Sequence, residues 1–199
     1  MKIIGITGGV GSGKSQVLTF MKERFGAVIC QADQVAWELQ EPGEKCYQDI
    51  VKCFGGEILN ADKTINRKAL GEIVFGNDAQ LRVLNGIMHP AVKAEINAII
   101  QKEREKGTTL FVLEAALLIE EHYDEICDEL WYISTDEQIR RHRLKESRNY
   151  SDEKIKAIME SQLPEEIFRK ACKRVVDNNG TFEKTCMQVE DLIKQLGEN

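Results

Sequence analysis

The sequence is short of the features that mark membrane and secreted proteins. Only three of its 199 residues are proline, and no internal repeat or low-complexity linker is visible. Its apolar runs are short as well: residues 115–119 form one of the longest, whereas a membrane-spanning helix needs roughly 20 apolar residues. The first expected strand begins at residue 2, which leaves no room for a signal peptide. We therefore expect a cytoplasmic protein with no membrane partner.

Metal-binding patterns and excess positive charge are also missing. The six cysteines include no C-x-x-C pair, and the three histidines are scattered along the chain. This spacing argues against a zinc site and favours reduced thiols. The formal net charge is −6 and the pI about 5.3. This negative charge argues against broad nucleic-acid binding. Any anionic substrate is expected to be held by a local cluster of positive charge, because the overall field of the chain repels it.

One strong motif stands out against these absences. Residues 8–15, with the sequence GGVGSGKS, fill every fixed position of the phosphate-binding pattern G-x-x-x-x-G-K-[ST]. A buried strand is expected over residues 2–7 and a helix over residues 15–24, which is the context that the motif requires. A glycine-rich turn joining a strand to a helix would explain the glycines but not the Gly-Lys-Ser ending. We therefore expect the chain to bind a nucleoside triphosphate together with Mg²⁺.

Each residue type in this loop has a physical role. Glycines let the backbone wrap closely around an anion, and the loop N–H groups and the following helix dipole face the phosphates. Lys14 is expected to neutralise charge on the β- and γ-phosphates, and the Ser15 hydroxyl to ligate Mg²⁺. The expected nucleotide-binding residues of the loop are Gly9, Gly11, Ser12, Gly13, Lys14, Ser15 and Gln16.

The rest of the chain alternates between expected strands and helices. Further strands are predicted over residues 27–30, 109–113, 130–134 and 174–177. Residues 35–77 are expected to be helical but broken, and a last amphipathic helix is expected from Phe182. A helix is expected up to His89-Pro90, and residues 92–100 are expected to form its continuation or a second helix. The residue before a proline avoids the helical conformation, which would place His89 at a helix break. This alternation predicts an α/β fold of the P-loop NTPase type, with a doubly wound parallel sheet of five strands.

Ligands bind outside the carboxyl ends of the strands in such sheets. The polar residues that follow the strands are therefore expected to meet at one edge: Asp33, Glu114, residues 135–136 and residues 178–180. Asp33 could orient an acceptor hydroxyl or take its proton, or it could cap a helix that starts at Gln34. Glu114 could organise Mg²⁺ directly or through water, or it could be a strand-end carboxylate in solvent.

Basic residues gather in the segment 140–148. In a helix, Arg141, Lys145 and Arg148 would share one face. Arginines on a mobile segment could close over bound phosphates, because guanidinium binds oxyanions through two hydrogen bonds, or they could form a solvated charged face. RNA contact is disfavoured because the run contains no aromatic stacking residue. His89 could likewise be structural or functional.

The residues alone favour a small-molecule kinase but leave other classes open. The chain lacks an Asn-Lys-x-Asp guanine-recognition motif, which disfavours a GTPase switch. The carboxylate after the second strand and the late arginine run favour phosphoryl transfer to an acceptor. A different nucleotide or nucleoside kinase is one alternative. A regulator whose ATP state controls a partner is another.

Over nearly its whole length the chain resembles the dephospho-CoA kinase family. The segments that carry the resemblance are residues 5–15, Ala32-Asp33, His89-Pro90, residues 113–120, Gln138 with Arg141 and Arg148, Gln162, and residues 177–180. The chain departs from the family pattern at Gln16, Gln31, Glu114 and Ala116. It also departs in a longer lid between Arg141 and Asn149.

This resemblance implies a reaction and an architecture. ATP, with Mg²⁺, phosphorylates the ribose 3′-hydroxyl of dephospho-CoA to give CoA and ADP, which is the last step of coenzyme A biosynthesis. A single kinase domain is implied over residues 1–199, with a helical acceptor-binding insertion at about 35–105 and a mobile lid at about 138–165.

The resemblance also implies roles for individual residues. Asp33, Lys14 and Arg141 are implied as the catalytic residues, with Asp33 as the base that orients the acceptor hydroxyl. Arg148 and Asn178 are implied as nucleotide-binding residues. The implied acceptor-side residues are Asp33, His89, Glu114 and Leu117.

Overall fold

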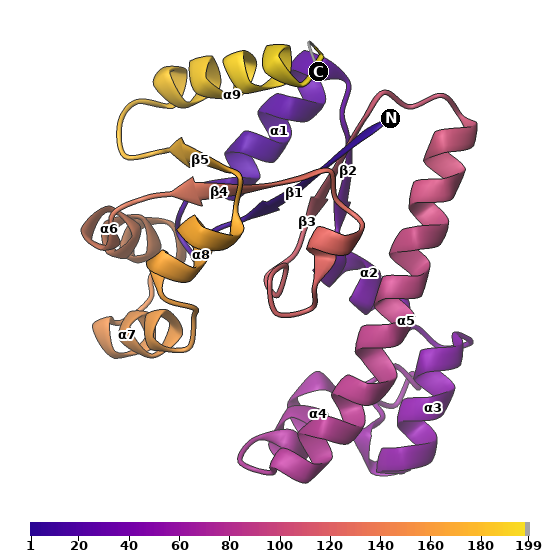
Figure 1. Ribbon diagram of the computed structural model, residues 1–199. Coiled ribbons are helices and arrows are strands. Elements are labelled where there is room, and N and C mark those ends of the chain that lie inside the picture. Colours follow the sequence, from indigo (N-terminus) through magenta and orange to yellow (C-terminus); the bar gives the residue numbers. More distant parts are fainter. Residues whose placement is uncertain (198–199) are drawn as a thin grey trace. The chain divides into compact units, whose positions relative to one another are not determined.

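The computed structural model describes residues 1–197, which form two compact units. The first unit contains residues 1–29 and the chain from residue 104 onward, and the second contains residues 30–103. Each unit is described by itself below, with element labels as in Figure 1.

A parallel β-sheet organises the first unit. Its strands are β1 (Lys2–Thr7), β2 (Val28–Gln31), which begins in this unit, β3 (Leu110–Glu114), β4 (Glu129–Ser134) and β5 (Arg174–Asp177). The strand order is β2-β3-β1-β4-β5, and β1 pairs in parallel with both β3 and β4. The predicted five-stranded parallel sheet is therefore confirmed, with β1 at its centre.

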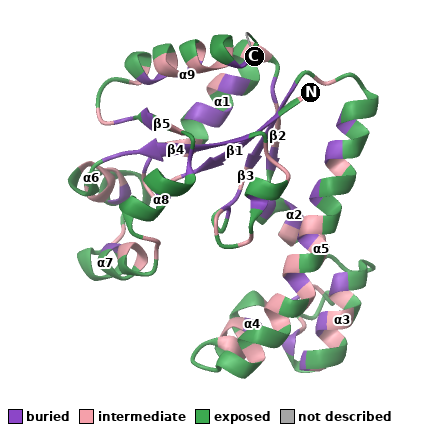
Figure 2. Cartoon of the chain, in the orientation of Figure 1, coloured by how far each residue is buried: buried purple, intermediate pink, exposed green. Residues whose placement is uncertain are grey.

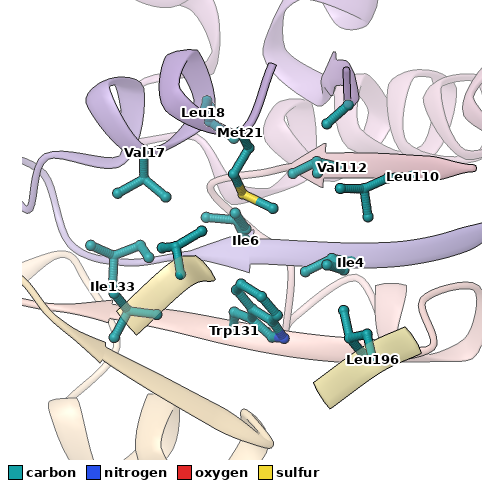
Figure 3. Close-up of a cluster of buried hydrophobic side chains, with 13 residues drawn as sticks. Ile4, Ile6, Val17, Leu18, Met21, Leu110, Val112, Trp131, Ile133 and Leu196 are labelled. Atoms are coloured by element: carbon teal, nitrogen blue, oxygen red, sulfur yellow. The ribbon is translucent and has the colours of Figure 1, made fainter. Parts of the chain in front are cut away.

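Two helices cover one face of this sheet and bury its apolar side chains. These are α1 (Lys14–Phe25) and α9 (Phe182–Gly197), which lie side by side in Figure 1. Figure 3 shows Ile4, Ile6 and Trp131 of the sheet packed beneath Met21 of α1, and all four side chains are fully buried. Because burying each such side chain stabilises the fold by about 1.5–3 kcal/mol, this cluster gives the adjoining loops a rigid base. Figure 2 shows the same burial along the strands.

Shorter helices follow β3 and β4 in the first unit. They are η2 (Tyr123–Glu125), α6 (Glu137–Arg148), α7 (Asp152–Glu160) and α8 (Glu165–Ala171). Asn149 ends α6 in the left-handed conformation, and Ser151 caps α7 by accepting a hydrogen bond from the Lys154 N–H. Phe168 of α8 stacks on Tyr132 of β4 with ring centroids 5.1 Å apart. This stacking ties the segment that follows α7 back to the sheet.

The second unit is helical. Its elements are α2 (Ala32–Glu38), α3 (Lys45–Phe54), η1 (Gly56–Ile58), α4 (Arg67–Val74) and most of α5 (Asp78–Glu105). This arrangement confirms the expected broken helical stretch. Its buried apolar residues include Ile50, Ile58 and Ile96, each fully buried. In the described part of the chain, none of the helices has the length and apolar character needed to cross a membrane.

The expected helix break at His89 is wrong, because α5 runs without interruption through Pro90. Proline removes one backbone hydrogen bond, to the carbonyl four residues earlier, and it crowds that carbonyl. Here that residue is Gly86, which has open space where a side chain would stand. Buried residues on either side of the proline, including Met88 and Val92, hold the helix by packing. Tertiary packing has overridden a local preference.

Candidate active site

The loop between β1 and α1 has the backbone geometry of an anion cradle. Gly11 and Gly13 adopt φ values of 83° and 90°, which side-chain-bearing residues rarely tolerate. The Ser12 N–H donates to the Gly9 carbonyl at 3.1 Å, closing a tight turn just before α1. Helix α1 begins at Lys14, one residue earlier than predicted. Its N-terminal N–H groups face the loop.

Glycine is needed in this loop for close packing as well. A Cβ atom built on Gly9 would overlap the guanidinium group of Arg140, and one on Gly13 would overlap the side-chain amide of Asn178. Both contacts come from residues more than 100 positions away in the sequence. The loop is therefore enclosed by α6 and by the segment after β5.

Lys14 and Glu114 lie together beneath the loop. The Lys14 ammonium donates to the Gly8 carbonyl at 2.6 Å and lies 3.8 Å from Oε1 of Glu114. The parallel register pairs Ile6 with Glu114, so the carboxylate stands beside the end of β1. Its side chain is only 12% exposed. The alternative in which Glu114 is a strand-end carboxylate in solvent is therefore wrong.

Arg140, to which the sequence assigned no individual role, contacts the loop from α6. Arg140 donates through Nε to the Val10 carbonyl at 2.9 Å and through a terminal nitrogen to Oε1 of Gln162 at 2.6 Å. The same Gln162 oxygen accepts the Val10 N–H at 3.2 Å. Burial lowers the pKa of Arg140 below its usual range, yet an arginine remains charged at neutral pH. One cation is thus held against the phosphate loop.

The other arginines of α6 make different contacts. Arg143 donates to the Asn178 carbonyl at 2.9 Å, so it also borders the loop. Arg141 pairs with Glu137 of its own helix at 2.8 Å, and Arg148 lies over the Tyr150 ring at 5.9 Å. A spacing of three residues places Arg140 and Arg143 on one helix face, but the sequence does not show which face of α6 meets the loop.

The convergence of residues that follow the strands is confirmed within the first unit. Thr135 after β4 and Asn178 after β5 are both buried, and both donate hydrogen bonds to the Ser12 carbonyl. Leu117 lies in the turn after β3 with a half-exposed side chain. Gln16 is exposed on the first turn of α1.

Two of the predicted site residues belong to the second unit. Asp33 is exposed in the first turn of α2, which begins at Ala32 with Gln31 at its N-cap position. The alternative that Asp33 caps a helix starting at Gln34 is therefore wrong. His89 is half-buried in α5. The next residue, Pro90, lines a cavity of about 570 Å³ together with Leu39, Ile87 and Ala94.

The chemistry of the loop suits a phosphorylated ligand with a hard cation. Ser15 is exposed and carries a hydroxyl oxygen, and Glu114 supplies a carboxylate oxygen. These are the ligand types that Mg²⁺ prefers. Among the residues that the structure describes, the Ser12 hydroxyl is buried without a hydrogen-bond partner. Such an orphaned group is rare in native proteins and points to a polar partner from outside the chain.

Comparison with known proteins gives a consistent result. A family model described as dephospho-CoA kinase matches residues 2–184. A dephospho-CoA kinase from Symbiobacterium thermophilum is 36% identical over 190 residues, which cover 96% of this chain and 79% of that protein. One from Dehalococcoides mccartyi is 38% identical over 192 residues, covering 95% and 96% of the two chains.

Solved structures show the same fold. The Thermus thermophilus protein TT1252 has a TM-score of 0.81 and 24% identity, with 98% of this chain and 97% of that chain covered. A dephospho-CoA kinase from Campylobacter jejuni has a TM-score of 0.73 and 23% identity, with 100% and 98% covered. The P-loop kinase fold expected from the sequence is therefore confirmed.

Proposed function

Because this chain belongs to the dephospho-CoA kinase family, we propose that its phosphate loop, its α6 arginines and Asp33 carry out the family's phosphoryl transfer. The enzyme uses ATP to phosphorylate dephospho-CoA, giving CoA and ADP in the last step of coenzyme A biosynthesis. The observation that carries this conclusion is the family match over residues 2–184, together with an ordered phosphate loop of matching chemistry.

The loop holds the donor in this proposal. The N–H groups of residues 11–16 donate hydrogen bonds to the phosphates of ATP, and Lys14 balances the charge on the β- and γ-phosphates. Ser15 would hold Mg²⁺, with Glu114 as a ligand directly or through water, and the metal would neutralise charge on the phosphate oxygens. The pairing of Glu114 with Lys14 supports this role, because it keeps the carboxylate beside the loop.

Asp33 acts on the acceptor. The ribose 3′-hydroxyl gives its proton to the Asp33 carboxylate as its oxygen bonds to the γ-phosphorus. The bond from the γ-phosphorus to the β–γ bridging oxygen breaks, and ADP leaves with that electron pair. The proposal is supported by the exposed position of Asp33 in the first turn of α2. His89, Leu117 and the cavity beside Pro90 are proposed to contact the acceptor.

The arginines of α6 stabilise charge on the moving phosphoryl group. Arg140 is the first candidate, because it already borders the loop at Val10. Arg141 and Arg148 are proposed as lid residues that bind phosphate when ATP is present. The ion pair of Arg141 with Glu137 is a partly exposed pair within one helix. Such pairs contribute less than about 1 kcal/mol, so phosphate can replace Glu137.

We also propose that the enzyme works in the cytoplasm on a small molecule, without a nucleic acid or membrane partner. The six cysteines are all free thiols, as expected in a reducing compartment. The formal charge of −6 disfavours nucleic acid.

One assay tests the proposed function. ADP formation is measured with Mg·ATP and dephospho-CoA, beside tubes that contain AMP or no acceptor, and the mass of the product is determined. ADP formed only with dephospho-CoA, with one phosphate added to it, is the expected result. Equal ADP in every tube would favour a nucleotide-hydrolysing regulator, and activity with AMP alone would favour a nucleotide kinase.

A further inference from the structure

Three side chains from separate segments converge on one backbone oxygen of the loop. The Ser12 carbonyl accepts hydrogen bonds from the Thr135 hydroxyl at 3.0 Å, the Asn178 amide at 2.7 Å and Arg143 at 3.4 Å. A carbonyl oxygen has two lone pairs, so this acceptor is saturated.

The Asn178 amide is itself held in place by α9. Thr185, which is 1% exposed, donates its hydroxyl to Oδ1 of Asn178 at 2.8 Å. The Ser12 carbonyl can only accept, so it fixes the orientation of the amide, with the N–H₂ group toward Ser12 and Oδ1 toward Thr185. The Thr185 hydroxyl donates to that oxygen and holds the amide in this position.

Anchoring this carbonyl also fixes the next N–H group. The Ser12 carbonyl and the Gly13 N–H belong to one planar trans peptide and point in opposite directions. With the carbonyl held by donors on one side, the Gly13 N–H is directed to the other side. Gly13 precedes the first residue of α1, where loop N–H groups and the helix dipole bind phosphate. The peptide can take this position only because Gly13 has no Cβ, whose place the Asn178 amide occupies.

We propose that Thr185 is a positioning residue for phosphate binding. It acts through Asn178 and the Ser12 carbonyl, and it keeps the Gly13 N–H aimed at the β-phosphate of the nucleotide. The inference rests on the proposed function of the loop as the ATP site. It gives α9 a role beyond core packing, through a side chain that is 1% exposed.

The test compares nucleotides that differ by one phosphate. Dissociation constants for ADP and AMP are measured by titration calorimetry for the full-length protein and its variants. Thr185→Val keeps the shape of the side chain but removes the donor, and ADP affinity is expected to fall about 3–10-fold while AMP affinity changes little. Thr185→Ser retains the hydroxyl and is expected to restore the ratio of ADP to AMP affinity. KM for ATP should rise in Thr185→Val more than kcat falls.

A matched variant separates positioning from loss of stability. Val189 lies one turn further along α9 and is fully buried in the core. Val189→Ala is expected to lower the melting temperature and to leave the ADP to AMP affinity ratio unchanged. If Thr185→Val does not fold, Thr135→Val removes a donor from the same carbonyl and is expected to shift the same ratio.

Two results would overturn the inference. One is an unchanged ratio of ADP to AMP affinity in folded Thr185→Val, and the other is a shift of this ratio in Val189→Ala as large as that in Thr185→Val. The proposed function fails separately. If Thr185→Val shifts the ratio of ADP to AMP affinity but the wild-type protein does not phosphorylate dephospho-CoA, the positioning role of Thr185 stands and the assigned acceptor is wrong.

Discussion

The ammonium group of Lys14 is held between the Gly8 carbonyl, at 2.6 Å, and the Glu114 carboxylate, at 3.8 Å, while both side chains are largely buried. The carboxylate thus balances the lysine charge at the base of the loop. Under the proposed function, phosphate oxygens that enter the loop would compete with Glu114 for that charge. Glu114 would then be available to Mg²⁺, and nucleotide binding and metal binding would be linked.

Glu114→Gln is therefore expected to weaken the use of Mg²⁺. The amide cannot balance the Lys14 charge and is a poorer ligand for a hard cation. The Mg²⁺ concentration that gives half-maximal activity should rise about 10–100-fold, the range seen when supporting residues of metal sites are changed. Steady-state rates over a Mg²⁺ titration measure this. Glu120→Gln, an exposed residue after the same strand, is the control, and an unchanged Mg²⁺ requirement in Glu114→Gln would exclude the role.

Asp33→Asn tests the proposed base. Asparagine keeps the size of the side chain but cannot take a proton, so kcat should fall by about 10²–10⁴-fold with little change in KM for ATP. Initial rates with saturating dephospho-CoA measure it. Glu41→Gln, an exposed carboxylate shortly after α2, should retain normal turnover. A near-normal kcat for Asp33→Asn would remove the residue from its proposed role.

Arg140→Lys tests the contact between α6 and the loop. A lysine cannot bond both the Val10 carbonyl and Gln162 with the fixed geometry of a guanidinium. We expect kcat/KM for ATP to fall at least about tenfold, on the order of one or two charge-assisted hydrogen bonds. Lys156→Gln, on the exposed surface of α7, is the comparison. An Arg140→Lys enzyme as active as Lys156→Gln would show that the contact has no part in catalysis.

The loop and its carboxylate could be predicted because their signals are local. The motif of residues 8–15 is contiguous, and Glu114 ends an apolar strand, so the rule for parallel sheets placed it beside the loop. The choice among the arginines had no such signal. Arg140 and Arg141 differ by about 100° around a helix axis, and only tertiary contacts decide which faces the loop.

Other parts of the structure depend on packing that no short pattern records. The continuity of α5 through Pro90 follows from buried neighbours on both sides of the proline. Thr185 belongs to no motif, and its importance arises because α9 packs where Asn178 follows β5. Asp33 was predicted from the chemistry of phosphoryl transfer, while the start of α2 at Ala32 excluded its use as a helix cap.

The last prediction concerns stability and follows from Glu129, a buried carboxylate at the start of β4. Its oxygens accept hydrogen bonds from Lys173 at 2.5 Å, Trp131 at 3.2 Å and Arg174 at 3.4 Å. Burial acts to raise the pKa of Glu129, but the hydrogen bonds from Lys173 and Trp131 and the positive charges of Lys173 and Arg174 together outweigh it and hold the pKa below its usual range. A carboxyl group with a lowered folded-state pKa stabilises the fold at neutral pH, and this stability is lost as pH falls through that pKa.

Glu129→Gln should therefore reduce the free energy of unfolding by about 1–3 kcal/mol at pH 7, the scale of hydrogen bonds to a charged group. Urea denaturation at pH 7 and at steps below pH 5 measures the difference from wild type, which should shrink as the wild-type carboxylate is protonated. Glu72→Gln removes an exposed ion pair with Lys68 and should change stability by less than about 1 kcal/mol. A deficit in Glu129→Gln that is as large at pH 3.5 as at pH 7 would mean that lost packing, and not the charge of Glu129, accounts for its stabilising effect.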